Sequence, residues 1–213
     1  SDKWEITTTR LETNTTELLS ADTLIVALPA PRAATVLAQL DTELSRELNE
    51  ISYAGCAIVL AGYVRDQFAQ PLAGFGFVVP EVERRRIIAC SYSSQKFTER
   101  APADSVLLRV FLGGACHPEV EQLADDELRK AATTELSELL GVRGAPQLCQ
   151  VRRWTGAMPQ YHVGHLARVA RIFDRASRYA GLALAGNAYH GVGIPNCIRS
   201  GEQAAERLLN ESA

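Results

Sequence analysis

Residues 182–209 read LALAGNAYHGVGIPNCIRSGEQAAERLL, and this is the most informative stretch of the sequence. It begins with a short apolar run typical of a buried strand, passes through a glycine-rich loop at 186–193, and continues into a helix with Pro195 in its first turn. Glycine lets the backbone approach a ligand closely, and a helix N-terminus presents unpaired N–H groups with partial positive charge. The stretch therefore predicts a strand–loop–helix unit that can hold an anion, although a plain tight turn explains the spacing at least as well.

A second apolar run lies near the other end of the chain, at 23–28 (TLIVAL). Continuous β-branched and apolar residues are typical of a strand buried on both faces, as in a parallel sheet. The runs at 4–9 and 16–19 predict a β-hairpin before it. The two apolar strands therefore predict the remnant of one sheet, with another layer inserted between them.

The middle of the chain predicts one broad antiparallel or mixed sheet packed with helices. Asp125 is a candidate N-cap for one of these helices, and Gly141 is a natural residue to end it. The expected strands cover 56–64, 75–79, 86–92, 106–112 and 147–154, and the expected helices cover 33–40, 41–50, 125–140 and 164–179.

Composition narrows the function classes. The chain has 213 residues and a net charge of -3, which gives no electrostatic indication of nucleic-acid binding. No apolar run is long enough for a membrane span, and the first residues do not show the charged and apolar regions typical of a signal peptide. The five cysteines are odd in number and far apart, so we expect neither a disulfide framework nor a zinc site, and a reducing cytoplasm fits best. His162 and His165 lack the partners of a metal site, so we expect no metal.

The loop and helix start, 186–201 (GNAYHGVGIPNCIRSG), resemble the C-terminal flavin motif of the oxygen-dependent protoporphyrinogen and coproporphyrinogen oxidases, within the flavin monoamine oxidase superfamily. The resemblance implies that the loop passes the isoalloxazine ring and that the helix N-terminus faces the pyrimidine end. Asn196 stands where the family commonly has aspartate, and asparagine can still cap a helix. The FAD contacts implied by the resemblance are at Gly186, Asn187, Gly191, Val192, Gly193 and Ile194.

Three further segments resemble the same family: 21–34 (ADTLIVALPAPRAA), 74–80 (GFGFVVP) and 154–165 (WTGAMPQYHVGH). For the last of these, the resemblance implies that Trp154 lies against the flavin, whereas a core or rim position is the usual fate of a lone tryptophan. Structural roles are at least as plausible as ligand contact for Tyr161 and His165, in the PQYxxGH signature.

Segment 74–80 has its own physical logic. Alternation directs Phe75, Phe77 and Val79 to one face of a strand, and Gly76 and Val78 to the other. One face can enter the core, and Gly76 leaves room on the other for a flat macrocycle; a plain core strand is the alternative. The resemblance implies that Phe75, Gly76 and Val78 line the porphyrinogen cavity, with Leu112 and Gly113 as weaker candidates for the same wall.

The resemblance also implies a fold class and a domain division. We expect an α+β fold with a mixed, largely antiparallel substrate-domain sheet, plus a remnant of the Rossmann-like FAD-binding domain. The expected boundaries assign 1–40 to that remnant, 41–180 to the substrate-binding domain, and 181–213 to the return into the FAD-binding domain.

The activity implied is stepwise dehydrogenation of protoporphyrinogen IX or coproporphyrinogen III, with hydride passing to FAD and O2 as the final acceptor. The chain has no GxGxxG motif to hold the FAD pyrophosphate, and it begins without methionine inside an apparent strand. We therefore expect a C-terminal fragment of a parent enzyme that is cytoplasmic or peripheral to the membrane. We expect the fragment to be inactive, to bind FAD weakly or not at all, and to self-associate through exposed apolar edges.

Two other functions stay open. One is a different oxidase of the superfamily, such as an amine oxidase or a carotenoid desaturase; amine oxidases usually carry an aromatic cage, for which the loop offers only Tyr189. The other is a tetrapyrrole-binding module without catalysis. No residue of the sequence stands out as a catalytic acid or base, and the two porphyrinogens are not separated at this stage.

Overall fold

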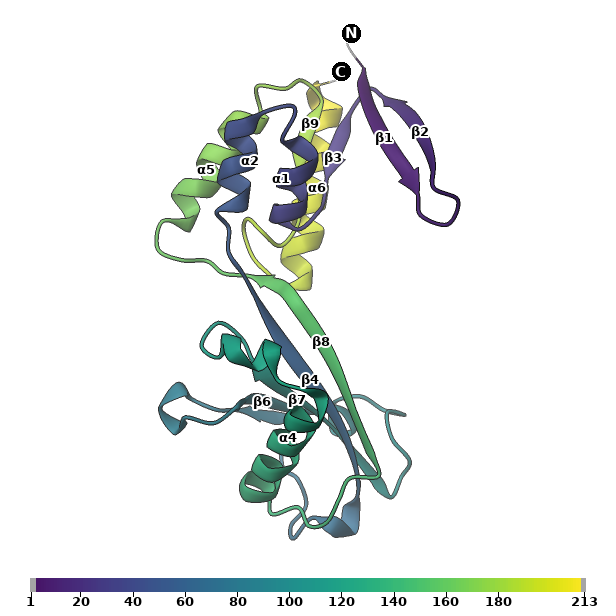
Figure 1. Cartoon of the computed structure of the whole chain (residues 1–213), viewed down its shortest axis with the longest axis vertical. Helices are drawn as coiled ribbons and strands as arrows, with labels where there is room; N and C mark the ends of the chain where they lie inside the picture. The colour runs from purple at the N-terminus through teal and green to yellow at the C-terminus, as the bar shows by residue number, and fades with distance from the viewer. Residues whose placement is uncertain (1–2, 212–213) are drawn as a thin grey trace. The chain divides into compact units, whose positions relative to one another are not determined.

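The computed structural model describes residues 3–211, and the chain divides into two compact units. One unit combines residues 1–52 with 159–213, and the other is the continuous stretch 53–158. We call them the two-segment unit and the inserted unit. The inserted unit holds the teal elements of Figure 1, together with most of the long strands β4 and β8.

The inserted unit is built on a five-stranded sheet with strand order β5-β6-β7-β4-β8. Strands β4 to β7 pair antiparallel with their neighbours, as the sequence predicted. The strands are β4 (Tyr53–Val64), β5 (Gly76–Val78), β6 (Ile87–Tyr92), β7 (Ser105–Gly113) and β8 (Leu148–Pro159). Three 3-10 turns and a short helix connect them: η1 (Arg65–Gln67), η2 (Glu81–Glu83), η3 (Pro118–Gln122) and α3 (Ser93–Lys96).

Helix α4 (Asp125–Leu140) covers one face of this sheet. Its buried residues Leu128, Ala132 and Leu136 recur at helical spacing and share one apolar core with alternate residues of the strands. The helix ends at Gly141, which has the left-handed φ of 63° that favours glycine. At its start, Asp125 is the first helical residue rather than the cap, and Glu127 accepts a hydrogen bond from the backbone N–H of Ala124.

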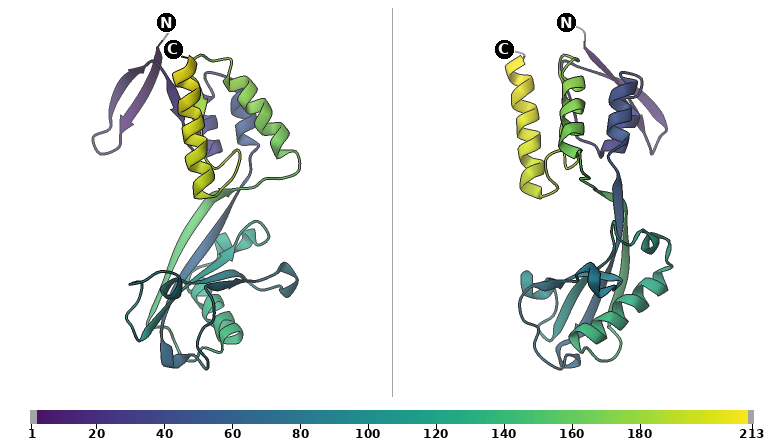
Figure 2. Two further views of the ribbon diagram at one scale, coloured as in Figure 1. Left: turned by 180° about the vertical axis from the view of Figure 1, so that it is seen from behind. Right: turned by 90° about the vertical axis from the view of Figure 1, so that its left-hand side faces the viewer.

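In its described part, residues 3–52 and 159–211, the two-segment unit contains two small sheets and four helices. A hairpin pairs β1 (Trp4–Arg10) with β2 (Thr15–Ala21), and β3 (Leu24–Val26) runs parallel to β9 (Leu182–Leu184). Strand β9 contacts both α5 and α6, which Figure 2 shows as separate green and yellow helices. The helices are α1 (Ala30–Leu37), α2 (Thr42–Asn49), α5 (His165–Ala176) and α6 (Ile194–Glu211).

Strand β3 differs from the sequence prediction in one respect. The continuous apolar run at 23–28 predicted burial on both faces, but Val26 is buried while Ile25 is 40% exposed. Among the described residues, β3 and β9 form a sheet of two strands. The outer face of so narrow a sheet therefore receives less cover than the composition of the run predicted.

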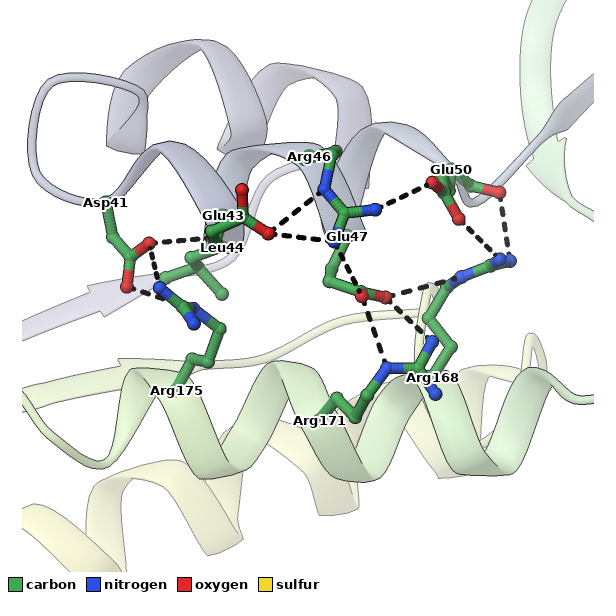
Figure 3. A network of polar contacts seen from close by, with 9 residues as sticks. All are labelled: Asp41, Glu43, Leu44, Arg46, Glu47, Glu50, Arg168, Arg171 and Arg175. Atoms are coloured by element: carbon green, nitrogen blue, oxygen red, sulfur yellow. Dashed lines mark hydrogen bonds and ion pairs between the residues drawn. The ribbon is translucent and has the colours of Figure 1, made fainter.

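Charged side chains join α2 to α5 in a row that we call the α2–α5 network (Figure 3). Asp41 caps α2 by accepting a hydrogen bond from the backbone N–H of Leu44 at 2.9 Å. Its carboxylate also accepts two hydrogen bonds from Arg175, at 2.7 and 3.2 Å. The Arg175 guanidinium lowers the pKa of Asp41 to about 2, with burial acting in the opposite direction.

The network continues along the helices. Arg171 donates two hydrogen bonds to Glu47, at 2.9 and 3.2 Å, and lowers the pKa of that largely buried carboxyl. Arg168 donates to the Glu50 carboxylate at 2.7 Å. The members of the network are Asp41, Glu43, Arg46, Glu47, Glu50, Arg168, Arg171 and Arg175.

These contacts explain where the compact units divide. The expected boundaries placed 41–180, and so α2 and α5, in the substrate-binding domain. In the structure both helices belong to the two-segment unit, because they contact each other and α2 contacts α1. The chain leaves this unit after Ser52 and returns at Pro159, and the N–H of Gln160 donates to the Ser52 carbonyl at 2.9 Å.

Within residues 3–211, every helix is too short or too polar to span a lipid bilayer.

Candidate functional site

The loop between β9 and α6 holds the first group of predicted site residues. Gly186 has a φ of 123°, and a Cβ built there would meet no other atom within 4 Å. Its N–H donates to the Ser200 hydroxyl at 3.0 Å, which ties the start of the loop to α6. Gly186 therefore presents a face of backbone without side-chain cover, where a ligand can approach closely.

Gly191 is required for a different reason. Its φ is 146°, and a Cβ there would lie 2.3 Å from Nδ2 of Asn196. The Asn196 amide folds back over the loop and donates to the His190 carbonyl at 3.4 Å. The asparagine at this position therefore supports the loop in front of the α6 N-terminus.

Tyr161 fixes the loop from the side. Its hydroxyl donates to the Asn187 carbonyl at 2.6 Å and accepts from the Gly191 N–H at 2.9 Å, so one atom bridges both ends of the loop. Burial raises the pKa of Tyr161, so its hydroxyl stays protonated and able to donate. The tyrosine ring stacks on His165, with ring centroids 3.9 Å apart.

His165 secures the base of the same loop. It is buried, and its Nε2 lies 2.9 Å from the Tyr189 carbonyl; because a carbonyl only accepts, Nε2 carries the proton. Tyr189 is fully buried and packs edge-on against Phe173. We call Tyr161 and His165 the loop clamp. The sequence favoured structural roles for both at least equally, but nothing in their spacing indicated that they hold the glycine loop.

The helix N-terminus after the loop is exposed. Ile194, the first residue of α6, is 77% exposed, and Val192 and Gly193 before it are exposed as well. The Gly193 carbonyl accepts the Cys197 N–H at 3.0 Å, which begins the helical hydrogen bonds. Backbone N–H groups at such an end suit a carbonyl or an anion that carries negative charge.

The second group of predicted residues lies in the inserted unit, on the face of the sheet away from α4. We call it the open face. Strand pairing arranges its central residues in two rows across β5, β6, β7 and β4. The first row is Gly76, Ser91, Arg109 and Leu60, and the second is Val78, Ala89, Phe111 and Ile58.

Gly76 is a position that only glycine fits. Its φ is 144°, and a Cβ there would lie 2.2 Å from the Cys90 carbonyl oxygen of the neighbouring strand. This backbone breaks the alternation expected for the segment. Phe77 packs against the core as predicted, but Phe75 is 66% exposed, and Val78 is 78% exposed on the open face.

A shallow depression of about 510 Å³ covers this part of the sheet. Its lining is mainly apolar, and the small residues Ala89 and Ser91 of β6 lie opposite Val78 and Gly76 of β5. The residues around it are Phe75, Gly76, Phe77, Val78, Ala89, Cys90, Ser91 and Phe111.

Leu112 and Gly113 do not lie on this face. Leu112 is fully buried in the core on the α4 side, and a Cβ at Gly113 would meet the Val120 side chain at 3.2 Å. Strand alternation explains the difference, because Phe111 occupies the open face and its neighbour faces the other way. Phe111 is therefore the residue of β7 that borders the depression, and the sequence prediction missed it.

Trp154 lies on β8 and is 53% exposed. Its neighbour Arg153 donates to Asp125 at 2.7 Å, on the α4 side of the sheet, so alternation directs Trp154 to the opposite side. The structure thus gathers six predicted residues on one loop of the two-segment unit, and Phe75, Gly76 and Val78 around one depression of the inserted unit. Among residues 3–211, no group of His, Cys, Asp and Glu could hold a metal ion.

The glycine loop, the parallel β3–β9 pair and the inserted, largely antiparallel sheet make up a mixed α+β fold of the kind found in the flavin amine oxidoreductases. Comparison with known families agrees: residues 2–209 match the model of the flavin containing amine oxidoreductases. The chain belongs to this family.

Its curated relatives include porphyrinogen oxidases. The chain is 32% identical over 200 residues to the coproporphyrinogen III oxidase of Bacillus subtilis, which covers 93% of this chain and 42% of that protein. It is 34% identical to the coproporphyrinogen III oxidase of Propionibacterium freudenreichii, in an alignment that covers 91% of this chain and 36% of the relative. It is 33% identical to the protoporphyrinogen oxidase of Bos taurus, in an alignment that covers 90% of this chain and 41% of the relative. The chain thus spans less than half the length of these relatives.

Solved structures support the fold. A structure from Exiguobacterium, provisionally assigned as a protoporphyrinogen oxidase, superposes with a TM-score of 0.78 at 28% identity, over 92% of this chain and 43% of that one. Reduced UDP-galactopyranose mutase superposes with a TM-score of 0.59 at 12% identity, over 80% and 36%, which reflects a shared fold alone.

Proposed function

We propose that this chain is the flavin-loop and substrate-sheet part of an FAD-dependent oxidase that dehydrogenates coproporphyrinogen III or protoporphyrinogen IX to the porphyrin. The observation that carries the proposal is the clamped glycine loop at 186–194 in a member of a flavin-containing family. The names of the curated relatives supply the substrate class.

The loop residues fit a flavin. The uncovered backbone at Gly186 allows a flat ring to approach, and the exposed Ile194 leads the N-terminal turn of α6, whose N–H groups suit the polar pyrimidine end. In the proposal, Gly186, Asn187, Gly191, Val192, Gly193 and Ile194 contact FAD. Trp154 of β8 is proposed to contact FAD as well.

When bound, FAD supplies the hydride acceptor, and O2 is the proposed final acceptor. The protein residues supply position. The loop clamp keeps the backbone of Asn187 and Gly191 in one conformation, so the loop is preorganised for the ring. On the open face, Phe75, Gly76 and Val78 provide a flat apolar wall for the macrocycle, with Phe111 beside them.

The burial of Tyr189 favours a porphyrinogen over an amine. An aromatic cage for an amine needs exposed aromatic faces beside the flavin, and Tyr189 is the only aromatic residue that the loop sequence offers besides histidine. In the structure its ring is fully buried against Phe173. It therefore serves the core of the two-segment unit.

The test is an oxidation assay of the protein as its gene encodes it, with coproporphyrinogen III, protoporphyrinogen IX and a primary amine as separate substrates. The expected result is a flavin absorbance spectrum after purification and porphyrin fluorescence that grows with O2 consumption. Turnover of the amine with no porphyrin formed would assign the chain to another branch of the family. Binding of porphyrin without flavin or turnover would assign it to a non-catalytic tetrapyrrole-binding module.

Two expectations concern the 213-residue chain by itself. Because it contains no GxGxxG motif, we predict that it does not retain stoichiometric FAD. The measurement is the ratio of flavin to protein absorbance after gel filtration. The same elution volume tests the prediction that the chain self-associates.

A further inference from the structure

Arg109 places a positive charge in the middle of the open face. It lies on β7, the central strand of the sheet, with Leu60 opposite it on β4 and Ser91 opposite it on β6. Its neighbours along the chain, Leu108 and Val110, are fully buried on the α4 side, so alternation directs the arginine to the open face. Its guanidinium lies 4.9 Å from the centroid of the Phe111 ring on the same face.

This arginine has no carboxylate partner between residues 3 and 211. Three other arginines of the inserted unit do have one: Arg85 pairs with Glu138 at 2.6 Å, Arg129 with Asp126 at 2.6 Å, and Arg153 with Asp125 at 2.7 Å. An unpaired cation that serves to prevent edge-to-edge aggregation is expected on an edge strand of a sheet. Strand β7 is the central strand of this sheet, so that role does not explain Arg109. Arg109 is therefore an exposed cation on the central strand, with Ser91, Leu60 and the Phe111 ring around it.

The two rows of the open face place this charge beside the flat depression. Gly76, Ser91 and Arg109 are directly opposite one another on three adjacent strands. With strands spaced about 4.8 Å apart, the Arg109 backbone lies roughly 10 Å from Gly76. A flat ring system over Gly76 and Ser91 thus has its rim next to the guanidinium, and the face of Phe111 lies beside both.

We propose that Arg109 recognises a propionate carboxylate of the tetrapyrrole on the open face, and so determines specificity for carboxylated macrocycles. The inference rests on the proposed function and deepens it. A planar guanidinium matches a carboxylate with two parallel hydrogen bonds, and here it lies over the Phe111 ring, which borders the depression. The small residues beside it accept the macrocycle, and the arginine selects for its charge.

The test compares coproporphyrin III, which carries four carboxylates, with its tetramethyl ester, which carries none. Each is titrated into the 15N-labelled chain in the same detergent-containing buffer, and amide and arginine Nε–Hε shifts are followed by NMR. We expect the wild type to prefer the acid over the ester, and Arg109→Gln to weaken binding of the acid about tenfold with the ester unchanged. Arg109→Lys should restore part of the lost affinity, because it keeps the charge without the fork.

The matched control is Arg86→Gln. It removes one exposed charge from the same unit near α4, where the backbone N–H of Arg86 donates to Glu135. This variant should bind the acid as the wild type does. Unchanged backbone spectra of both variants in the absence of ligand will show that the sheet is intact.

Two outcomes overturn the inference in distinguishable ways. If the wild type binds both compounds and Arg109→Gln changes neither affinity, the role of Arg109 is excluded while the proposed substrate class stands. If the wild type binds neither compound at millimolar concentration, the open face is no tetrapyrrole site and the proposed function loses its substrate wall as well. Equal weakening by Arg86→Gln would reduce the effect to net charge and also exclude a specific role.

Discussion

Both units bury apolar side chains, but in the two-segment unit a row of charged pairs also joins two helices. In the inserted unit, alternate residues of four strands and one face of α4 form a continuous apolar core. In the two-segment unit, α2 and α5 are joined by Asp41, Glu47 and their arginine partners. Apolar burial is non-directional, whereas charge-assisted hydrogen bonds depend on geometry and on protonation. The two units should therefore fail under different perturbations.

The division matches the proposed division of labour. A wall for an apolar macrocycle needs a stiff sheet, and its open face can carry exposed side chains because the other face is fully packed. A loop for a cofactor needs its backbone fixed at a few points, which Tyr161 and His165 provide through hydrogen bonds. Each unit is thus stabilised in the way that its proposed ligand requires.

The largest expected effect is in the core of the inserted unit. Leu108 is fully buried on the central strand, so Leu108→Ala should lower the free energy of unfolding of this unit by about 3–4 kcal/mol. Urea denaturation followed by Trp154 fluorescence, in a Trp4→Phe background, measures it. The control Val78→Ala, on the exposed side of β5, should stay within about 0.5 kcal/mol. A comparable loss in the control would mean that the open face is packed.

A smaller effect is expected in the α2–α5 network. Asp41→Asn keeps the size of the side chain but removes the charge that pairs with Arg175, and it weakens the cap of α2. We expect a loss of about 2–3 kcal/mol in the two-segment unit, measured by urea denaturation through Trp4 fluorescence in a Trp154→Phe background. Asp174→Asn, in an exposed pair with Arg178, is the matched control and should cost less than about 0.5 kcal/mol.

In the wild type, acid should destabilise the two-segment unit before it destabilises the inserted unit. The folded-state pKa of Asp41 is lowered to about 2 and that of Glu47 is lowered as well. Their stabilisation is complete above the unfolded pKa of about 4 and is lost as the pH falls towards 2, which is worth about 2 kcal/mol for Asp41. Circular dichroism and amide NMR between pH 5 and 2 should show α2 and α5 loosening before the inserted sheet. Simultaneous loss of both units would contradict this.

High pH should destabilise the inserted unit instead. Burial raises the pKa of Tyr63 and of Cys90 in the inserted core to about 12. Because these groups are neutral when folded, their contribution is complete below the unfolded values of about 9 to 10 and declines as the pH rises towards 12. Amide exchange in β6 and β4 above pH 10, compared with Cys90→Ala, measures the part that the thiol supplies.

The smallest expected effect is local. Tyr161→Phe removes the hydroxyl that bridges Asn187 and Gly191, with the ring still stacked on His165. We expect about 1 kcal/mol less protection of the Gly191 amide against hydrogen exchange. The Ala185 amide, which donates to the Val26 carbonyl, is the internal control and should keep its rate. Unchanged exchange at Gly191 would show that the loop does not depend on its clamp.

Sequence patterns predicted most of the strands and helices because their apolar periodicity is local. The hairpin, the strands of the inserted sheet, α4 and the strand–loop–helix unit all appear where expected. Strand register depends on residues far apart in the sequence, so the sequence could not predict that Arg109 pairs with Ser91 and Leu60. For the same reason it did not predict that Phe111, and not Leu112, lies on the open face. The loop clamp was missed for the same reason, since 26 residues separate Tyr161 from Asn187.

The ends of the inserted unit have a practical consequence. The chain leaves the two-segment unit at Ser52 and re-enters it beside the same residue, where the backbones of Ser52 and Gln160 are hydrogen-bonded. A short Gly-Ser bridge could therefore join 52 to 159, and residues 53–158 could be produced alone as an uninterrupted gene segment. Exchanging such a cassette between relatives would test whether residues 53–158 carry the proposed substrate preference while the loop at 186–193 is kept unchanged.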